Sequence, residues 1–328
     1  MKQFLQKNRV NILLLIGSFC ISIFAIEIGM RLFYTPEPVL ELGNIIPWYE
    51  KLNYTPRKNQ YGFREEEVSD TIFQKKFIRI LILGDSFTFG VGVEKGEDRF
   101  TDIIESRLNS EKKNSNLIYH IYNAGVLGTK PEDWSGYLDQ AMLMYKPHYV
   151  FAVFFLRDGT DLCTSFRFLI PVINSIKAKY TDNLLYKYTY IGRYIGDVLI
   201  RHDFTVYYIG QLRNAYLGSK VQKKTWAKQQ HFLFRMQQVC KKNGVEFHLI
   251  LFPVLYDLES NYPFYEVEDE ITRFANRIDM PVFSLTPGFI GQSSHTLWIS
   301  PNDQHPNEKG HRIAADTLYP YIKQVIGY

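Results

Sequence analysis

Two short segments carry residue types that together could perform nucleophilic catalysis. Ser86 ends the sequence Ile-Leu-Ile-Leu-Gly-Asp-Ser, and near the other end of the chain His305 follows Asp303 by two residues in a turn-rich segment. A serine hydroxyl is a weak nucleophile until a base removes its proton, and a histidine oriented by a carboxylate can be that base. The two segments therefore predict a Ser-His-Asp arrangement.

The residues before Ser86 predict where its side chain lies. Residues 80–83 are aliphatic without polar alternation, which is typical of a parallel strand covered on both faces. Gly84 permits a sharp turn, and Asp85 can cap a helix that begins near Ser86. Ser86 is therefore expected at the carboxyl end of a strand, where open α/β sheets bind their ligands.

The two segments also resemble a known family. Gly-Asp-Ser-Phe at residues 84–87 and Asp-x-His-Pro-Asn-x-x-Gly-His at residues 303–311 are similar to the first and last motif blocks of the SGNH (GDSL) hydrolase superfamily, in the same order. The resemblance implies catalysis by Ser86, His305 and Asp303. That superfamily more often places its aspartate three residues before the histidine, a position held here by Asn302.

A glycine-rich segment at residues 123–129 resembles the second block of the superfamily. The resemblance implies that the backbone N–H of Gly128, with Gly125 as the fallback, forms an oxyanion hole with the N–H of Ser86. A glycine suits this task because its amide can approach a developing oxyanion without steric hindrance from a side chain.

The third block departs from the family pattern. The superfamily usually has Gly-x-Asn-Asp, whereas residues 157–161 read Arg-Asp-Gly-Thr-Asp, so that Arg157 stands where the asparagine belongs. The positive charge of Arg157 would favour an oxyanion, but the side chain could instead pair with Asp158 or Asp161. We therefore expect Arg157 to complete the oxyanion hole or to mark a member with altered catalysis.

Two other histidines are weaker candidates for the base. His311 belongs to the same motif, but its position at the start of the closing helix suits packing or capping. His248 lies inside an apolar run and is expected to be a hydrogen-bonded core histidine.

Strands and helices alternate along most of the chain. The pattern predicts strands near residues 80–83, 117–122, 149–156, 245–253 and 280–285, and helices near residues 100–108, 134–145, 229–243, 266–278 and 312–326. This order predicts a three-layer α/β/α domain with a mainly parallel, flavodoxin-like sheet. Residues 164–230 interrupt this order as a Tyr- and Lys-rich helical insertion. Three roles remain open for it: a lid that shapes the substrate pocket, a surface that faces the membrane near the anchor, and packing alone.

The N-terminal segment predicts a membrane anchor. Three basic residues precede an apolar stretch at residues 10–26, which reaches Tyr34 if Glu27 and Arg31 pair at the outer interface. Positive charge before the span predicts a single pass with the N-terminus inside and the rest of the chain outside the cytoplasm. A cleaved signal peptide is the alternative, although no Ala-x-Ala-like site follows the apolar run.

The predicted domains are an anchor at residues 1–34, an extended linker at 35–76 and a hydrolase domain at 77–328. Within the linker, Asn-x-x-Gly-Phe-Arg at residues 59–64 resembles a signature that precedes the first strand in membrane-anchored members of the superfamily. We interpret this signature as a structural clamp, with a position near the site as the alternative.

Composition excludes several classes of partner. A net charge of +4 with scattered Lys and Arg argues against nucleic acid, and 46% hydrophobic residues suffice for a large core. The three cysteines lack metal-ligand spacing, and Gly-Val-Gly at residues 90–92 is too short for a phosphate loop, so no cofactor is expected.

The predicted function is an esterase that acts on an acyl-ester small molecule or an acylated glycan by two-step acyl transfer. An O-acyltransferase that modifies an envelope or secreted polysaccharide is the first alternative, because the sequence does not specify the acyl acceptor. A membrane-tethered, inactive glycan-binding or assembly factor is the second, because the third block lacks its asparagine. The oligomeric state is not encoded in any motif.

Overall fold

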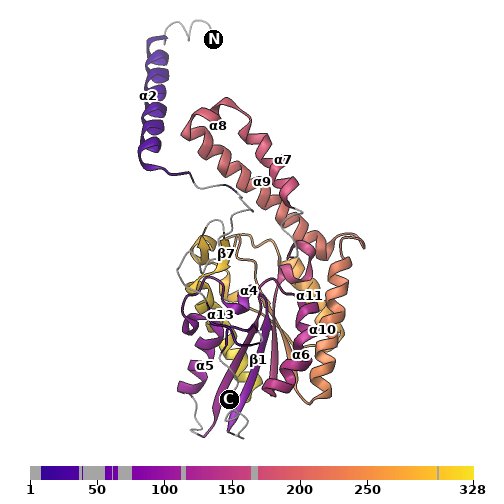
Figure 1. Cartoon of the computed structure of the whole chain (residues 1–328). Coiled ribbons are helices and arrows are strands. Elements are labelled where there is room, and N and C mark those ends of the chain that lie inside the picture. The colour runs from indigo at the N-terminus through magenta and orange to yellow at the C-terminus, as the bar shows by residue number, and fades with distance from the viewer. Residues whose placement is uncertain are drawn as a thin grey trace. The chain divides into compact units, whose positions relative to one another are not determined.

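The computed structural model describes residues 9–36, 39, 56–60, 62–65, 76–111, 116–163, 169–300 and 303–328. The chain divides into two compact units, one formed by residues 1–44 and 167–208 and the other by residues 45–166 and 209–328 (Figure 1). Most of the predicted linker, and Asn302, lie outside the described residues.

The larger unit is built around a five-stranded parallel sheet with strand order β2-β1-β3-β4-β5. The strands are β1 (Phe77–Gly84), β2 (Ile118–Gly125), β3 (Tyr149–Phe155), β4 (Glu246–Phe252) and β5 (Val282–Ser284). Residues 80–83 of β1 and 150–154 of β3 are fully buried, because helices cover both faces of the sheet. The predicted parallel α/β fold is confirmed, with the flavodoxin order of strands.

Helices form a layer on each side of this sheet (Figure 1). One layer contains α5 (Phe100–Glu111) and α13 (Glu308–Val325), and the other contains α6 (Pro131–Tyr145), α10 (Lys224–Lys242) and α11 (Tyr265–Arg277). The short elements are α4 (Ser86–Phe89), η2 (Gly96–Asp98), η3 (Leu156–Gly159), η4 (Asp161–Cys163), α12 (Thr286–Phe289) and η6 (Ser294–Leu297). Since β2 and β3 lie on opposite sides of β1, the carboxyl end of β1 is the topological switch point of the sheet.

A small hairpin near the C-terminus differs from the expected loop. β6 (Trp298–Ser300) and β7 (Asp303–Pro306) pair antiparallel, and the helix that follows begins at Glu308 rather than at residue 312. The difference arises at Asn307, whose side chain accepts hydrogen bonds from two backbone amides of the first turn of α13. Asparagine is a strong helix N-cap, so the residue fixes the earlier start.

The smaller unit contains the predicted insertion and the N-terminal helix. The insertion forms α7 (Leu169–Thr181), α8 (Leu184–Tyr188) and α9 (Tyr190–Leu217), and α9 continues into the larger unit. The N-terminal helix is α2 (Arg9–Phe33).

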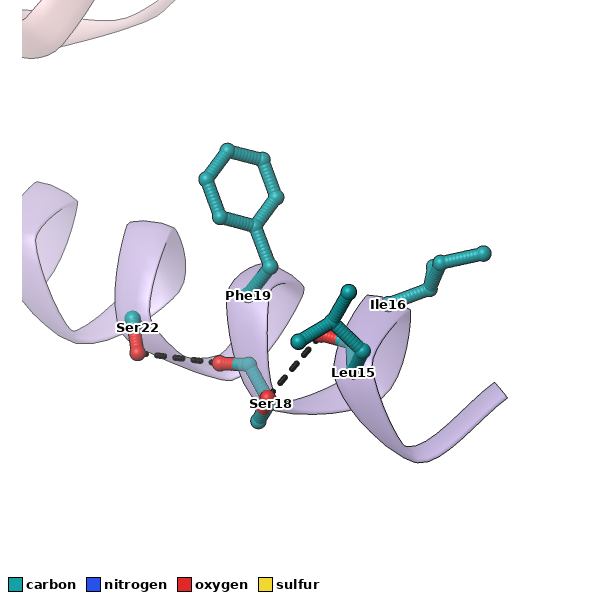
Figure 2. Close-up of a pocket in the computed structure, with 5 residues that line it drawn as sticks. All are labelled: Leu15, Ile16, Ser18, Phe19 and Ser22. Carbon is teal, nitrogen blue, oxygen red and sulfur yellow. Dashed lines mark hydrogen bonds between the residues drawn. The ribbon is translucent and has the colours of Figure 1, made fainter. Parts of the chain in front are cut away.

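Helix α2 has the properties of a membrane span. Among the described residues, Val10–Phe33 is the one helix that is long and apolar enough to cross a bilayer, with a mean hydropathy of 2.4 and an exposed surface. Figure 2 shows that the hydroxyls of Ser18 and Ser22 donate to the carbonyls of Leu15 and Ser18, each at 2.9 Å. These polar groups are thus satisfied without water, as lipid surroundings require, although length and composition also fit a signal sequence.

Candidate active site

Ser86 is the first residue of α4 and directly follows the turn at the end of β1. Ser86 is only 4% exposed. The side chain of Asp85 accepts a hydrogen bond of 2.8 Å from the N–H of Phe87 and so caps the helix. First-turn amides have no acceptor within the helix, and no described residue accepts the N–H of Ser86, so this amide can bind a ligand oxygen beside the hydroxyl.

His305 and Asp303 reach Ser86 from strand β7. His305 Nε2 lies 2.9 Å from Ser86 Oγ, and His305 Nδ1 lies 2.5 Å from Asp303 Oδ1. In a neutral imidazole Nδ1–H then donates to the carboxylate, while Nε2 accepts the serine hydroxyl. The structure therefore brings the three predicted residues into one chain of hydrogen bonds, with the imidazole oriented to take the serine proton.

The hairpin docks onto the loop that follows α4. Ile299 of β6 packs against the buried side chains of Phe89 and Val91. Gly92, with φ = 91°, lies directly beneath this isoleucine, and a side chain there would collide with it. The contact fixes the hairpin over α4 and with it the position of His305.

Asn307 ties this hairpin to helix α13. Its Nδ2 donates to the carbonyls of Thr296 at 3.0 Å and Trp298 at 3.1 Å. Its Oδ1 accepts from the amides of Lys309 and Gly310. The sequence analysis assigned no role to this residue, although an asparagine directly before a helical run is a recognisable cap signal.

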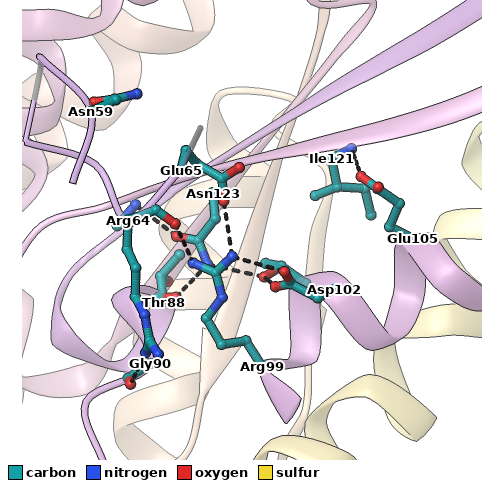
Figure 3. A network of polar contacts seen from close by, with 12 residues as sticks. Asn59, Arg64, Glu65, Thr88, Gly90, Arg99, Asp102, Glu105, Ile121 and Asn123 are labelled. Carbon is teal, nitrogen blue, oxygen red and sulfur yellow. Dashed lines mark hydrogen bonds and ion pairs between the residues drawn. The ribbon is translucent and has the colours of Figure 1, made fainter. Parts of the chain in front are cut away.

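The Asn-x-x-Gly-Phe-Arg segment supports the same loop from another side (Figure 3). Arg64 donates to the carbonyls of Gly90 at 2.9 Å and Glu94 at 2.7 Å. Arg99 donates to the Arg64 carbonyl at 2.7 Å and pairs with Glu65 at 3.0 Å. Arg64 thus holds the loop after α4, as a clamp would.

The two candidate amides of the glycine-rich loop after β2 differ in their hydrogen bonds. The Gly125 N–H already donates to Asn123 Oδ1 at 3.0 Å. Gly128 has φ = 72°, a Cβ built on it would meet no atom within 4 Å, and no residue in the described ranges accepts its N–H. This geometry favours Gly128 over the fallback Gly125.

Arg157 approaches the nucleophile through Asp85. Its Nη2 lies 3.8 Å from Asp85 Oδ2, and Ser86 Oγ lies 3.4 Å from the same oxygen. The guanidinium also covers the ring of Phe155 at 5.5 Å. Arg157 therefore lies next to the carboxyl that neighbours the nucleophile.

The acidic neighbour of Arg157, Asp158, has a raised pKa. Asp158 is fully buried, and burial, with the nearby carboxylate of Asp85, raises the pKa of Asp158 well above its ordinary value. One oxygen of Asp158 accepts from the Phe155 N–H at 3.0 Å, and the other has no donor among the described residues. Burial therefore favours the neutral form of Asp158 beside Arg157.

The two remaining candidate histidines lie in packed surroundings away from this chain of hydrogen bonds. His311 stacks on Phe100 at 5.9 Å, and burial lowers its pKa to about 3. His248 contacts the Tyr321 hydroxyl at 2.9 Å and the Glu246 carboxylate at 3.4 Å. Across the described part of the chain, no three His, Cys, Asp or Glu side chains are grouped to hold a metal ion.

The sequence of the chain matches one protein family. A family model described as GDSL-like Lipase/Acylhydrolase matches residues 80–318, a range that begins within β1 and ends within α13. No curated protein matches the chain.

Several solved structures are similar to the chain at low identity. The psychrotrophic esterase EstA from Pseudoalteromonas sp. is 16% identical, with a TM-score of 0.45 over 76% of this chain and 99% of that one. The lipase/acylhydrolase from Enterococcus faecalis is 13% identical, with a TM-score of 0.46 over 75% and 96%. Axe2, an acetylxylan esterase from Geobacillus stearothermophilus, is 13% identical, with a TM-score of 0.45 over 76% and 94%.

Proposed function

Because the chain belongs to the GDSL-like lipase and acylhydrolase family and is a hydrolase of that type, we propose that it is a serine esterase acting outside the cytoplasm. The observation that carries this proposal is the hydrogen-bonded chain from Ser86 through His305 to Asp303. A nucleophile, a base and an orienting carboxylate in this geometry are the parts that acyl transfer requires.

In the first half-reaction, Ser86 Oγ attacks the carbonyl carbon of an ester while His305 Nε2 takes the hydroxyl proton. The oxyanion that forms accepts hydrogen bonds from the amides of Ser86 and Gly128, with Arg157 adding positive charge. The intermediate then expels the alcohol, which receives the proton from His305. Asp303 keeps Nδ1 protonated and stabilises the imidazolium between these steps.

In the second half-reaction, the acyl group passes from Ser86 to an acceptor. His305 removes a proton from a water molecule, whose oxygen attacks the acyl carbonyl. The tetrahedral intermediate collapses, Ser86 regains its proton from His305, and the carboxylic acid leaves. A sugar hydroxyl in place of water would make the same step an O-acyl transfer to a glycan.

The proposed location follows from α2. Its apolar length fits one membrane span, and the basic residues before it favour an N-terminus in the cytoplasm. Glu27 and Arg31, the charged residues of the span, pair with each other at 2.8 Å. We infer a single-pass anchor with the hydrolase domain outside the cytoplasm.

The test is hydrolysis of p-nitrophenyl acetate by the full-length protein in detergent. We expect Ser86→Ala and His305→Ala each to lower turnover by at least about 10³-fold, since either loss removes the acyl-transfer chemistry. Ser260→Ala and His231→Ala change an exposed serine and an exposed histidine and serve as matched controls.

Two outcomes bear on the proposal directly. If a folded wild type is as inactive as Ser86→Ala towards a range of acyl esters, the esterase proposal fails. If an added polysaccharide accelerates release of p-nitrophenol and becomes acylated in a Ser86-dependent way, the natural acceptor is a glycan rather than water.

A further inference from the structure

The end of helix α2 is fixed to the corner between α8 and α9. Both carboxylate oxygens of Glu27 accept hydrogen bonds from the first amides of α9, those of Tyr190 at 2.9 Å and Ile191 at 3.0 Å. Arg31 pairs with Glu27 and also donates to the Tyr188 carbonyl at 2.9 Å. A negative charge at a helix N-terminus is favourable, so Glu27 is an N-terminal cap supplied by another helix.

This contact sets the depth of the α8–α9 corner relative to the span. Glu27 lies six residues before the end of α2 at Phe33, which corresponds to about 9 Å along a helix axis. Tyr34 adds a second contact, an edge-to-face packing on Tyr194 with 5.8 Å between ring centroids. The start of α9 therefore lies level with the last two turns of α2, and not beyond its end.

The same corner carries an exposed apolar surface. On α8 the exposed fractions are 73% for Leu184, 68% for Leu185 and 71% for Tyr188. The surface continues on α9 with Tyr194, Ile195 and Val198, while residues on the opposite side of α9, such as Ile200, are buried. We call these six exposed residues the α8–α9 apolar surface.

We propose that the α8–α9 apolar surface lies in the extracytoplasmic interface of the bilayer, beside the end of the span. The proposal rests on the anchoring role of α2, because only then does the depth of Glu27 place this surface at the level of the lipids. Leucine and isoleucine enter the boundary of the acyl chains, and tyrosine is favoured where apolar and polar layers meet. Arg193, which is exposed, can extend towards lipid phosphates.

Lipid, rather than a second copy of the chain, is the occupant that this geometry favours. A surface at the level of the last turns of a span is adjacent to the headgroup layer whether or not another protein is present. The apolar face of an amphipathic helix in this layer is buried by about 5–10 Å. Burial in lipid would remove the unfavourable free energy of exposing the α8–α9 apolar surface to water.

The experiment measures contact with lipid directly in the full-length protein in nanodiscs of phosphatidylcholine and phosphatidylglycerol. In a protein whose three cysteines are replaced, single variants Leu185→Cys, Ile195→Cys, Phe24→Cys and Asn174→Cys each carry the fluorophore NBD. Phe24 reports on the span, and Asn174, an exposed polar residue of α7, is the matched control of the same unit. Lipids with a nitroxide at a shallow or a deep acyl position serve as quenchers.

We expect shallow nitroxide lipid to quench the labels at Leu185 and Ile195 at least about twofold more than the label at Asn174. The label at Phe24 is expected to respond most strongly to the deep nitroxide. If Phe24 is quenched but Leu185 and Ile195 behave like Asn174, the α8–α9 apolar surface is covered by protein or water, and the inference is wrong. If the label at Phe24 is not quenched either, the proposal that α2 is a membrane anchor is wrong.

Discussion

At the scale of single residues, the site differs from its family at Arg157. Where the family places a neutral asparagine, this chain has a cation 3.8 Å from Asp85 Oδ2, the oxygen that Ser86 Oγ also approaches. Burial raises the pKa values of both Asp158 and Asp85, which reduces the negative charge that the guanidinium faces. We expect the guanidinium of Arg157 to attract the negative charge of a developing oxyanion as well as the carboxyl of Asp85.

The substitution Arg157→Ala tests this role. We expect kcat for p-nitrophenyl acetate to fall about 10²–10³-fold with little change in KM, as for the loss of one oxyanion donor. Arg157→Asn, which restores the family residue, should recover a large part of the activity. An alanine variant with wild-type kcat would show that Arg157 only neutralises Asp85.

At the scale of elements, the position of His305 depends on how the hairpin of β6 and β7 is held. His305 lies on β7, a strand of four residues that pairs only with β6 among the described strands. So short a hairpin is not stable alone and needs external support. Ile299 supplies apolar packing, and Asn307 supplies hydrogen bonds to the carbonyls of Thr296 and Trp298.

Asn307 has two roles, support of the hairpin and capping of α13, which different substitutions can test one at a time. Asn307→Asp keeps an acceptor for the first amides of α13 but removes the donor to the carbonyls of Trp298 in β6 and Thr296 in η6. We expect this variant to lose about tenfold or more in kcat with a nearly unchanged Tm, whereas Asn307→Ala loses both activity and about 1 kcal/mol of stability. Asn276→Ala on an exposed face of α11 is the control. Equal kcat for Asn307→Asp and wild type would contradict a positioning role.

At the scale of the whole molecule, a buried histidine couples folding of the hydrolase domain to pH. His311 is fully buried, and its pKa falls from an ordinary 6.5 to about 3. The folded protein therefore keeps it neutral while the unfolded chain binds a proton below pH 6.5. The free energy of unfolding accordingly decreases as the pH falls from 6.5 towards 3, by up to about 1.4 kcal/mol per pH unit from this residue.

Urea unfolding at several pH values measures this effect. In His311→Gln the free energy of unfolding should fall less steeply with decreasing pH between 6.5 and 4 than in wild type, whatever its value at pH 7. His231→Gln, a substitution of an exposed histidine, is the control and should keep the wild-type slope. Parallel curves for wild type and His311→Gln would mean that His311 does not drive acid unfolding.

The sequence by itself determined the fold class and the identity of the chemical groups. Aliphatic runs such as residues 80–83 and 149–156 have no polar alternation, so they specify strands covered on both faces. Local signals also indicated Ser86 at a strand end and an acid beside His305, because a turn residue or a motif spacing is a property of a few consecutive residues.

Only the tertiary structure decided which groups meet. Ser86 and His305 are 219 residues apart, and no local pattern encodes a distance of 2.9 Å between them. The hairpin escaped prediction because its strands of three and four residues are too short for a periodic signal, and packing on Gly92 and α4 defines them. The raised pKa of Asp158 likewise depends on burial beside Asp85, which arises only when separate strand ends converge.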